Sequence, residues 1–154
     1  MEPASWRRRS AEDVAAEFRY ARDSFPGLKE VFFDDDTFNY QKARTIELAA
    51  KLKPLNFTWS CTSRVTTDHE TLRAMKEAGC RLLIVGYESG DPQILRNIKK
   101  GATVDMAIRF TDNCRKLGLA VHGDFIVGLP GETRESLRRT IEFAKRLDVE
   151  TIQV

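Results

Sequence analysis

The chain has 154 residues, of which 42% are hydrophobic and 31% are charged, and its formal net charge at pH 7 is +2. This composition is typical of one globular domain and excludes an intrinsically disordered chain, while the small net charge gives no reason to expect nucleic acid as a partner. No apolar run approaches the ~20 residues of a membrane-spanning helix and no secretory signal is recognisable, so we expect a cytoplasmic protein without a membrane span.

Helices and strands alternate along the whole sequence. A helix is predicted from the capping residue Ser10 to the break at Pro26, after a solvated entry formed by residues 6–10 (WRRRS). The predicted strands are residues 28–33, 56–63, 81–86, 119–128 and 150–154. The helices between them are predicted at residues 40–53, 66–79, 103–117 and 133–147, with a short one after Asp91. Such alternation predicts an α/β fold with parallel strands, covered by helices, in one domain spanning residues 1–154.

The two ends of the sequence also carry information about the fold. The chain begins with a helix and stops within an apolar strand, and native sheets avoid leaving such an edge unpaired. We therefore expect an excerpt from a longer barrel-like protein, whose missing barrel segments would be partners of this chain.

The cysteines do not suggest a metal site. Cys61, Cys80 and Cys114 lie 19 and 34 positions apart, which excludes the short spacings of zinc knuckles and iron–sulfur motifs. Cys80 and Cys114 are predicted to pack as small hydrophobic residues, and Trp59 is predicted to lie in the core.

Charged or hydroxyl-bearing residues follow the ends of four predicted strands. These segments read DDDTFN, SCTSR, YESG and GLPGET. In parallel α/β folds the carboxyl ends of the strands meet at one edge, where the βα loops build the active site. The convergence of polar groups on this edge predicts a ligand site.

The third of these strand ends places a carboxylate and a hydroxyl between two glycines. Gly86 and Gly90 let the backbone turn sharply and approach a ligand closely. Glu88 would then serve as a fixed acceptor for vicinal hydroxyls or an ammonium group. The alternative is that Glu88 and Ser89 cap the short helix that follows.

The first strand end carries three adjacent carboxylates, which repel one another. Strand alternation would send Asp35 to the opposite face from Asp34 and Asp36, and Asp36 is expected to cap a helix or lie in a solvated loop. Nothing in the spacing identifies a metal site.

The remaining strand ends offer weaker candidates. Arg64 could bind a carboxylate through two hydrogen bonds, although a surface arginine explains it equally well. Thr133 is expected to cap the following helix, and a single strand histidine such as His122 is more often packed or surface-facing than catalytic.

These strand ends, in this order, resemble the radical S-adenosylmethionine (SAM) superfamily. The segments EVFFDDDTF, WSCTSR, AGCRLLIVGYESGDPQILRNIKKG and GDFIVGLPGET carry the resemblance, which spans nearly the whole chain. Within the superfamily the chain is most similar to the branch whose members often carry a cobalamin-binding domain. It resembles hopanoid-biosynthesis-associated radical SAM proteins, and the anaerobic magnesium-protoporphyrin monomethyl ester oxidative cyclases are related to them.

The resemblance implies a partial (β/α)6 TIM barrel that binds S-adenosylmethionine and a [4Fe–4S] cluster, with cobalamin as a further cofactor. It implies radical chemistry on a small-molecule substrate, such as an oxidative cyclisation or rearrangement in hopanoid or tetrapyrrole-type metabolism. Asp34 and Asp35 would lie by the methionyl amine and the substrate, and Glu88 and Ser89 would approach the ribose or the amine. The residues implied to border the adenine are Ile126, Gly128, Leu129 and Gln153.

The sequence departs from the superfamily at its cluster motif, CxxxCxxC, which is absent. Cluster ligation needs thiolates held close together, so we expect that this chain alone does not bind the cluster in the family manner and is inactive. No catalytic residue and no metal ligand is predicted within it.

Two alternatives stay open. One is a barrel fragment of the aldolase or isomerase type, which is disfavoured because no glycine-rich phosphate cradle followed by a basic residue occurs at a strand end. The other is a non-catalytic interaction domain.

Overall fold

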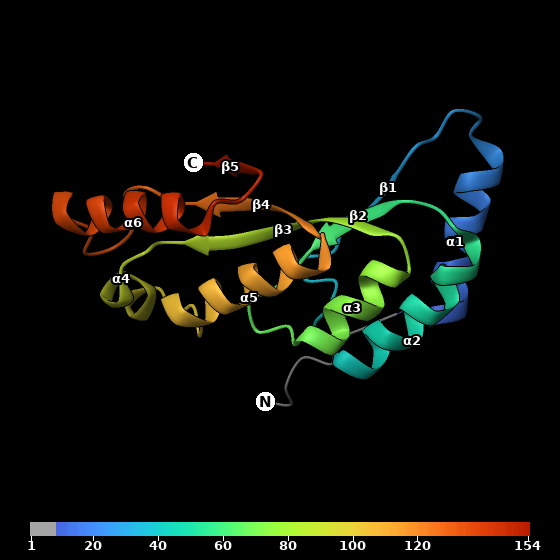
Figure 1. Ribbon diagram of the computed structural model, residues 1–154, viewed down its shortest axis with the longest axis horizontal. Coiled ribbons are helices and arrows are strands. Elements are labelled where there is room, and N and C mark those ends of the chain that lie inside the picture. The colour runs from blue at the N-terminus through green and yellow to red at the C-terminus, as the bar shows by residue number, and fades with distance from the viewer. Residues whose placement is uncertain (1–8) are drawn as a thin grey trace, which may run out of the picture.

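The structure is a computed structural model and describes residues 9–154, within which five parallel strands form one sheet in the order β1-β2-β3-β4-β5 (Figure 1). The strands are β1 (Val31–Phe33), β2 (Trp59–Thr62), β3 (Cys80–Glu88), β4 (Ala120–Phe125) and β5 (Thr151–Gln153). The α-helices are α1 (Ala11–Ser24), α2 (Lys42–Leu52), α3 (His69–Glu77), α4 (Pro92–Asn97), α5 (Val104–Leu117) and α6 (Arg134–Leu147), and a 3-10 turn, Lys53–Leu55, follows α2. The alternation and the parallel pairing that the sequence predicts are confirmed.

Capping residues fix where these helices begin. The Ser10 side chain accepts a hydrogen bond from the Asp13 N–H at the start of α1, as predicted. At α6 the Thr133 side chain accepts from the Ser136 N–H while the Ser136 side chain accepts from the Thr133 N–H, which confirms the predicted cap. These bonds satisfy backbone donors that have no partner inside the helix.

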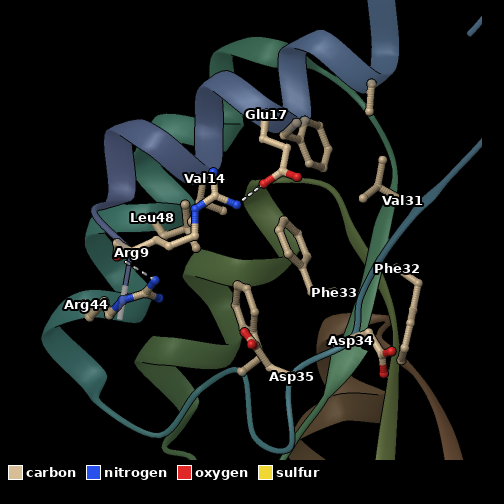
Figure 2. Close-up of a pocket in the computed structure, with 13 residues that line it drawn as sticks. Arg9, Val14, Glu17, Val31, Phe32, Phe33, Asp34, Asp35, Arg44 and Leu48 are labelled. Atoms are coloured by element: carbon tan, nitrogen blue, oxygen red, sulfur yellow. Dashed lines mark hydrogen bonds and ion pairs between the residues drawn. The ribbon is translucent and has the colours of Figure 1, made fainter. Parts of the chain in front are cut away.

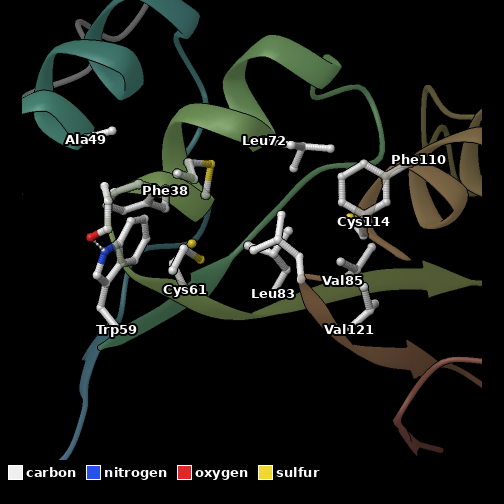
Figure 3. Packing of buried hydrophobic residues seen from close by; sticks show 14 of the residues in the cluster. Phe38, Ala49, Trp59, Cys61, Leu72, Leu83, Val85, Phe110, Cys114 and Val121 are labelled. Atoms are coloured by element: carbon white, nitrogen blue, oxygen red, sulfur yellow. Dashed lines mark hydrogen bonds between the residues drawn. The ribbon is translucent and has the colours of Figure 1, made fainter. Parts of the chain in front are cut away.

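The hydrophobic core lies between the sheet and its helices (Figure 3). Every second residue of β3 points into it, so Leu83 and Val85 are fully buried. Trp59 is also fully buried, as predicted, and its indole N–H donates to the Ala78 carbonyl at 2.8 Å. Cys80 and Cys114 pack there as expected, and Cys61 joins them.

The opposite face of the sheet carries the alternate residues and is only partly covered. On β3 these are Leu82, Ile84, Gly86 and Glu88, all of intermediate exposure. We call this the open face. Because polar residues gather on it near the carboxyl ends of the strands, it is where a ligand site would lie.

The carboxyl ends of two strands differ from the sequence-based expectations. Strand β3 continues through Gly86 to Glu88, whereas we expected a turn at Gly86, and β4 ends at Phe125 rather than at Gly128.

The expected solvated entry at residues 6–10 falls mostly on residues 6–8, which lie outside the described part of the chain. No helix within residues 9–154 is long and apolar enough to cross a bilayer.

Candidate functional site

The carboxyl edge of the sheet brings together residues that are far apart in the sequence. Asp34 follows β1, Glu88 ends β3 and Gly128 follows β4, and all three strands run in the same direction. Neighbouring strands lie about 4.8 Å apart, so these loops form one continuous rim.

Glu88 occupies the centre of this rim. A Cβ atom added at Gly86 would lie 2.4 Å from Glu88 Oε1, so the carboxylate lies directly over the Gly86 backbone on the open face. The absent side chain of Gly86 leaves the space that this carboxylate fills. The role of Gly86 is therefore to make room for a side chain of the protein, whereas we expected it to turn the backbone.

Lys100 holds the Glu88 carboxylate in place. Its Nζ lies 2.6 Å from Glu88 Oε1, and the two side chains are 31% and 17% exposed. Lys100 comes from the loop after α4, where Lys99 and Gly101 both have positive φ. A charge-assisted hydrogen bond of this length fixes both groups while leaving each one a surface toward solvent.

Acceptors continue across the open face from Glu88. Gly86 pairs in register with Asp124 of β4, and Asp124 pairs with Gln153 of β5. The Glu88 carboxylate over Gly86 thus stands in the same row as the Asp124 and Gln153 side chains. We call Glu88, Lys100, Asp124 and Gln153 the rim site.

His122 lies two residues before Asp124, on the same face of β4. Its Nδ1 is 2.7 Å from Thr151 Oγ1, and its Nε2 is 3.2 Å from Asp124 Oδ1. The imidazole therefore orients the Asp124 carboxylate from below, a position that suits a supporting residue better than a catalytic one.

The aspartates after β1 lie on the other side of the rim, beside a hollow of about 620 Å³ between α1 and β1. Figure 2 shows Asp34 and Asp35 turned to different sides of the chain, as strand alternation predicts. Both are exposed, as is Asp36. The Asp35 carbonyl accepts a hydrogen bond from Thr62 Oγ1 at 2.5 Å, which ties this loop to β2.

Arg64 stands beside the same loop. Its guanidinium carbon lies 5.0 Å from the centre of the Tyr40 ring, a cation–π contact at the rim. A buried hydrogen bond of 2.7 Å from Asn39 Nδ2 to Ser63 Oγ joins the loops that carry the two residues.

Ser89 is directed away from the rim. It is fully buried, and its hydroxyl lies 3.0 Å from Thr140 Oγ1 of α6. The Ser89 hydroxyl therefore faces α6, whereas the resemblance implied that Ser89 approaches the ribose or the amine. Helix α4 is capped by Asp91, whose Oδ1 accepts from Gln93 and Ile94, so Glu88 is not the cap.

The loop after β4 contains Ile126, Gly128 and Leu129. Ile126 is 47% exposed, Gly128 has a φ of 90°, and the Gly128 N–H donates to Glu132 Oε2 at 2.6 Å. An exposed apolar side chain and a glycine therefore lie in the loop that directly follows the strand carrying Asp124.

Sequence reasoning missed Lys100 and Asp124. Asp124 was hidden because the predicted strand ran on to Gly128, which placed it inside the strand. Lys100 carries no local signal, because only the folded loop after α4 brings it next to Glu88. Among the described residues, no cluster of histidine, cysteine and acidic side chains could hold a metal ion.

Residues 3–144 match the family model of the radical SAM superfamily. The chain belongs to this superfamily. It is 41% identical over 151 residues to an uncharacterized methyltransferase of Pyrococcus horikoshii, covering 96% of this chain and 33% of that protein. It is 30% identical over 149 residues to cytidylyl-2-hydroxyethylphosphonate methyltransferase of Streptomyces wedmorensis, covering 90% and 28%.

Among solved structures, the radical SAM methyltransferase TsrM of Kitasatospora setae superposes with a TM-score of 0.85 and 22% identity, covering 94% of this chain and 30% of that one. One TsrM structure holds tryptophan and a SAM analogue, and another holds cobalamin and a [4Fe–4S] cluster. This likeness confirms the radical SAM fold. The chain spans about a third of the length of these curated relatives.

Proposed function

We propose that the rim site binds S-adenosylmethionine and that the chain is the cofactor-binding part of a radical SAM methyltransferase acting on a small molecule. The observation that carries the proposal is the Glu88 carboxylate, held over Gly86 by Lys100 in one row with Asp124 and Gln153. The relatives are methyltransferases, so we propose methyl transfer in place of the oxidative cyclisation or rearrangement that the resemblance suggested.

The rim site matches the chemistry of S-adenosylmethionine group by group. The two ribose hydroxyls need acceptors, which Glu88 and Asp124 provide, and the methionyl carboxylate needs a cation, which Lys100 provides. The adenine would lie against the exposed Ile126 side chain and the backbone at Gly128, with Leu129 next in the same loop. Gln153 can hydrogen-bond the adenine edge from β5.

Asp34 and Asp35 are proposed to face the methionyl amine and the substrate from the β1 side. The strand register places Asp34 level with Ile84 of β3, so Glu88 lies two strands across and four residues further along, roughly 16 Å away by strand geometry. Ser89 supports the site from behind and contacts no ligand.

The cysteines of this chain do not fit a [4Fe–4S] cluster. Burial raises the pKa of the Cys114 thiol to about 12 and also raises the pKa of Cys61, which disfavours the thiolates that iron binds. All three cysteines face the core, away from the rim site. In a radical SAM enzyme the reduced cluster supplies the electron that cleaves S-adenosylmethionine, and no residue described here is assigned to that step.

Further segments of a longer protein, a substrate and cobalamin complete the proposal. A largely apolar groove of about 540 Å³ between α6 and β5, with Ile141, Ile152 and Val154 on its wall, would suit an additional helix of the same barrel. Cobalamin is proposed only for such a longer protein, since no contact to it is assigned here. A cytoplasmic location stays a prediction.

Calorimetric titration of the purified chain tests the proposal. We expect heat of binding with S-adenosylmethionine and none with ribose 5-phosphate. Replacing Asp124 by Asn should weaken binding about tenfold, because a charged acceptor is lost. The control Asp105→Asn, on the exposed first turn of α5, should not change it. Binding of the sugar phosphate alone would favour the aldolase or isomerase alternative, and binding of neither would favour an interaction domain.

A further inference from the structure

Glu88 has a backbone conformation that needs external support. Its φ is 62°, a region that residues other than glycine rarely adopt. The Ser89 N–H donates to the Tyr87 carbonyl at 2.8 Å, which closes a tight γ-turn with Glu88 at its apex. Such a strained turn persists only where the surrounding structure over-determines it.

A pair of buried hydroxyls provides one part of that support. Thr140 Oγ1 lies 3.2 Å from the Ser136 carbonyl, to which it donates its only hydrogen. It must therefore accept the bonds of 3.0 Å from Ser89 Oγ and from the Gly90 N–H. Ser89 Oγ in turn accepts from the Asp91 N–H at 3.1 Å. Each hydroxyl hydrogen thus has one assigned acceptor, and no buried group of the pair is unsatisfied.

The next two residues bind the same helix. A Cβ atom at Gly90 would lie 2.4 Å from Phe143 Cβ and 2.9 Å from the Arg139 carbonyl, so only glycine allows α6 to pack this closely. The Asp91 carboxylate, 4% exposed, receives Arg139 Nε at 2.6 Å. Residues 89–91 are therefore fixed to the middle of α6, outside the rim site.

We propose that Thr140 and Ser89 are positioning residues that impose the turn at Glu88 and so place its carboxylate over Gly86. We call this hydroxyl pair the α6 clamp. The inference rests on the proposed function, because Glu88 is the ligand contact that the α6 clamp would position. Since α6 follows β4, the clamp also ties Glu88 to the strand that carries Asp124.

A second hydroxyl pair on the same strand provides a matched control. Tyr87 Oη lies 2.6 Å from Thr111 Oγ1 of α5, and Thr111 also donates to a carbonyl four residues earlier, that of Ala107, at 2.9 Å. Thr111 and Thr140 are each 4% exposed. Replacing either threonine by valine removes one buried hydroxyl while keeping the side-chain shape. Thr111→Val leaves the Tyr87 hydroxyl unpaired, and Thr140→Val leaves the Ser89 hydroxyl and the Gly90 N–H unpaired. Only Thr140 is bonded to the segment that follows Glu88.

The experiment compares Thr140→Val, Thr140→Ser and Thr111→Val in two measurements. The first is the affinity for S-adenosylmethionine, at a temperature where all the chains are folded. We expect Thr140→Val to weaken it about tenfold, because a misplaced carboxylate loses a charge-assisted hydrogen bond. Thr140→Ser should restore wild-type affinity and Thr111→Val should leave it within about twofold, although both valine variants lower the melting temperature.

The second measurement needs no ligand and separates this inference from the proposed function. The carboxyl ¹³C resonance of Glu88, assigned with Glu88→Gln, reports its contact with Lys100. We expect Thr140→Val to shift it and Thr111→Val to leave it in place. If the wild-type chain binds no S-adenosylmethionine, the proposed function fails. The shift of the Glu88 resonance still shows whether the α6 clamp positions the Glu88 carboxylate. An unchanged Glu88 resonance in a folded Thr140→Val chain would overturn the inference.

Discussion

Strand β3 has an ion pair at each end, and the two ends differ in backbone conformation and in the buried groups behind them. At the amino end, Arg81 donates two hydrogen bonds to Glu30 Oε2, at 3.2 and 2.8 Å, from a point where the register between β2 and β3 shifts but the backbone φ is not positive. At the carboxyl end, Glu88 pairs with Lys100 from a backbone with positive φ, next to a register shift between β3 and β4. Both ends have a register shift, but only the pair at the carboxyl end sits on a strained turn, which α6 supports.

An ion pair at a strand end therefore does not by itself indicate a ligand site. Exposed pairs of this kind contribute roughly 0–1 kcal/mol to stability, and native proteins carry many of them. What distinguishes the carboxyl end is backbone strain, a glycine that makes room for a carboxylate, and a buried polar network behind it. Strain that is maintained at a strand end is most simply explained by function.

The largest expected effect concerns the core side of the sheet, where Cys114 of α5 packs and which we predict to be chemically inert. With its pKa at about 12, Cys114 should react with iodoacetamide at pH 8 at least roughly a thousandfold more slowly than in unfolded chain, because little thiolate forms. Mass spectrometry of native and urea-treated samples measures the rate of this labelling.

The native chain should also gain no absorbance near about 400 nm after anaerobic iron–sulfur reconstitution. Rapid labelling of Cys114 in the native chain, or a stoichiometric iron–sulfur cluster, would show that the core cysteines are accessible to reagents or to iron.

The next effect concerns the space at the carboxyl end. Gly86→Ala places a Cβ 2.4 Å from the present position of Glu88 Oε1, so the carboxylate must move aside. The backbone itself is not strained by the new side chain, because Gly86 has no positive φ. We expect affinity for S-adenosylmethionine to fall roughly 10- to 100-fold, as for loss of a charged hydrogen bond, with little change in melting temperature. The control is Arg81→Ala at the amino end, which should leave affinity unchanged. Wild-type affinity in Gly86→Ala would mean that the place of the carboxylate does not matter.

A smaller effect concerns the pH dependence of the support behind Glu88. Burial disfavours the ionised form of Asp91, but the Ile94 N–H, Arg139 and the Gln93 N–H outweigh it, so its pKa lies below the ordinary value. A carboxyl with a lowered folded-state pKa stabilises the fold above its unfolded pKa of about 3.9. That stability is lost as the pH falls through the folded-state value.

The measurement is urea unfolding of wild type and Asp91→Asn between pH 7 and pH 3. We expect the wild type to lose its advantage over the variant as the solution becomes acidic. A stability difference that is constant over this range would mean that Asp91 is not ionised in the folded protein.

Much of the fold was predictable from the sequence because its signals are local. The apolar periodicity and the caps at Ser10 and Thr133 indicated the elements in their order. The placement of polar groups at one edge followed from parallel strands, which brought Asp34, Glu88 and Gly128 to the same rim.

The rest of the site depends on contacts between distant parts of the chain. Lys100 reaches Glu88 only after α4 and its loop have formed, and Thr140 meets Ser89 across 51 positions. The direction of Ser89 was within reach, because the alternation of Leu83, Val85 and Tyr87 toward the core already predicts that Ser89 faces the helices. The turn at Glu88 could not be predicted, because no sequence signal indicates a positive φ at a glutamate.

The most direct test of a ligand site at the carboxyl end of β3 is calorimetric titration of S-adenosylmethionine into the wild type, Glu88→Gln and Glu30→Gln. Both variants neutralise one carboxylate of an ion pair that involves a residue of β3, at opposite edges of the sheet. We predict that Glu88→Gln weakens binding roughly 10- to 100-fold and that Glu30→Gln leaves it within about twofold. Equal affinities in all three chains would contradict this account.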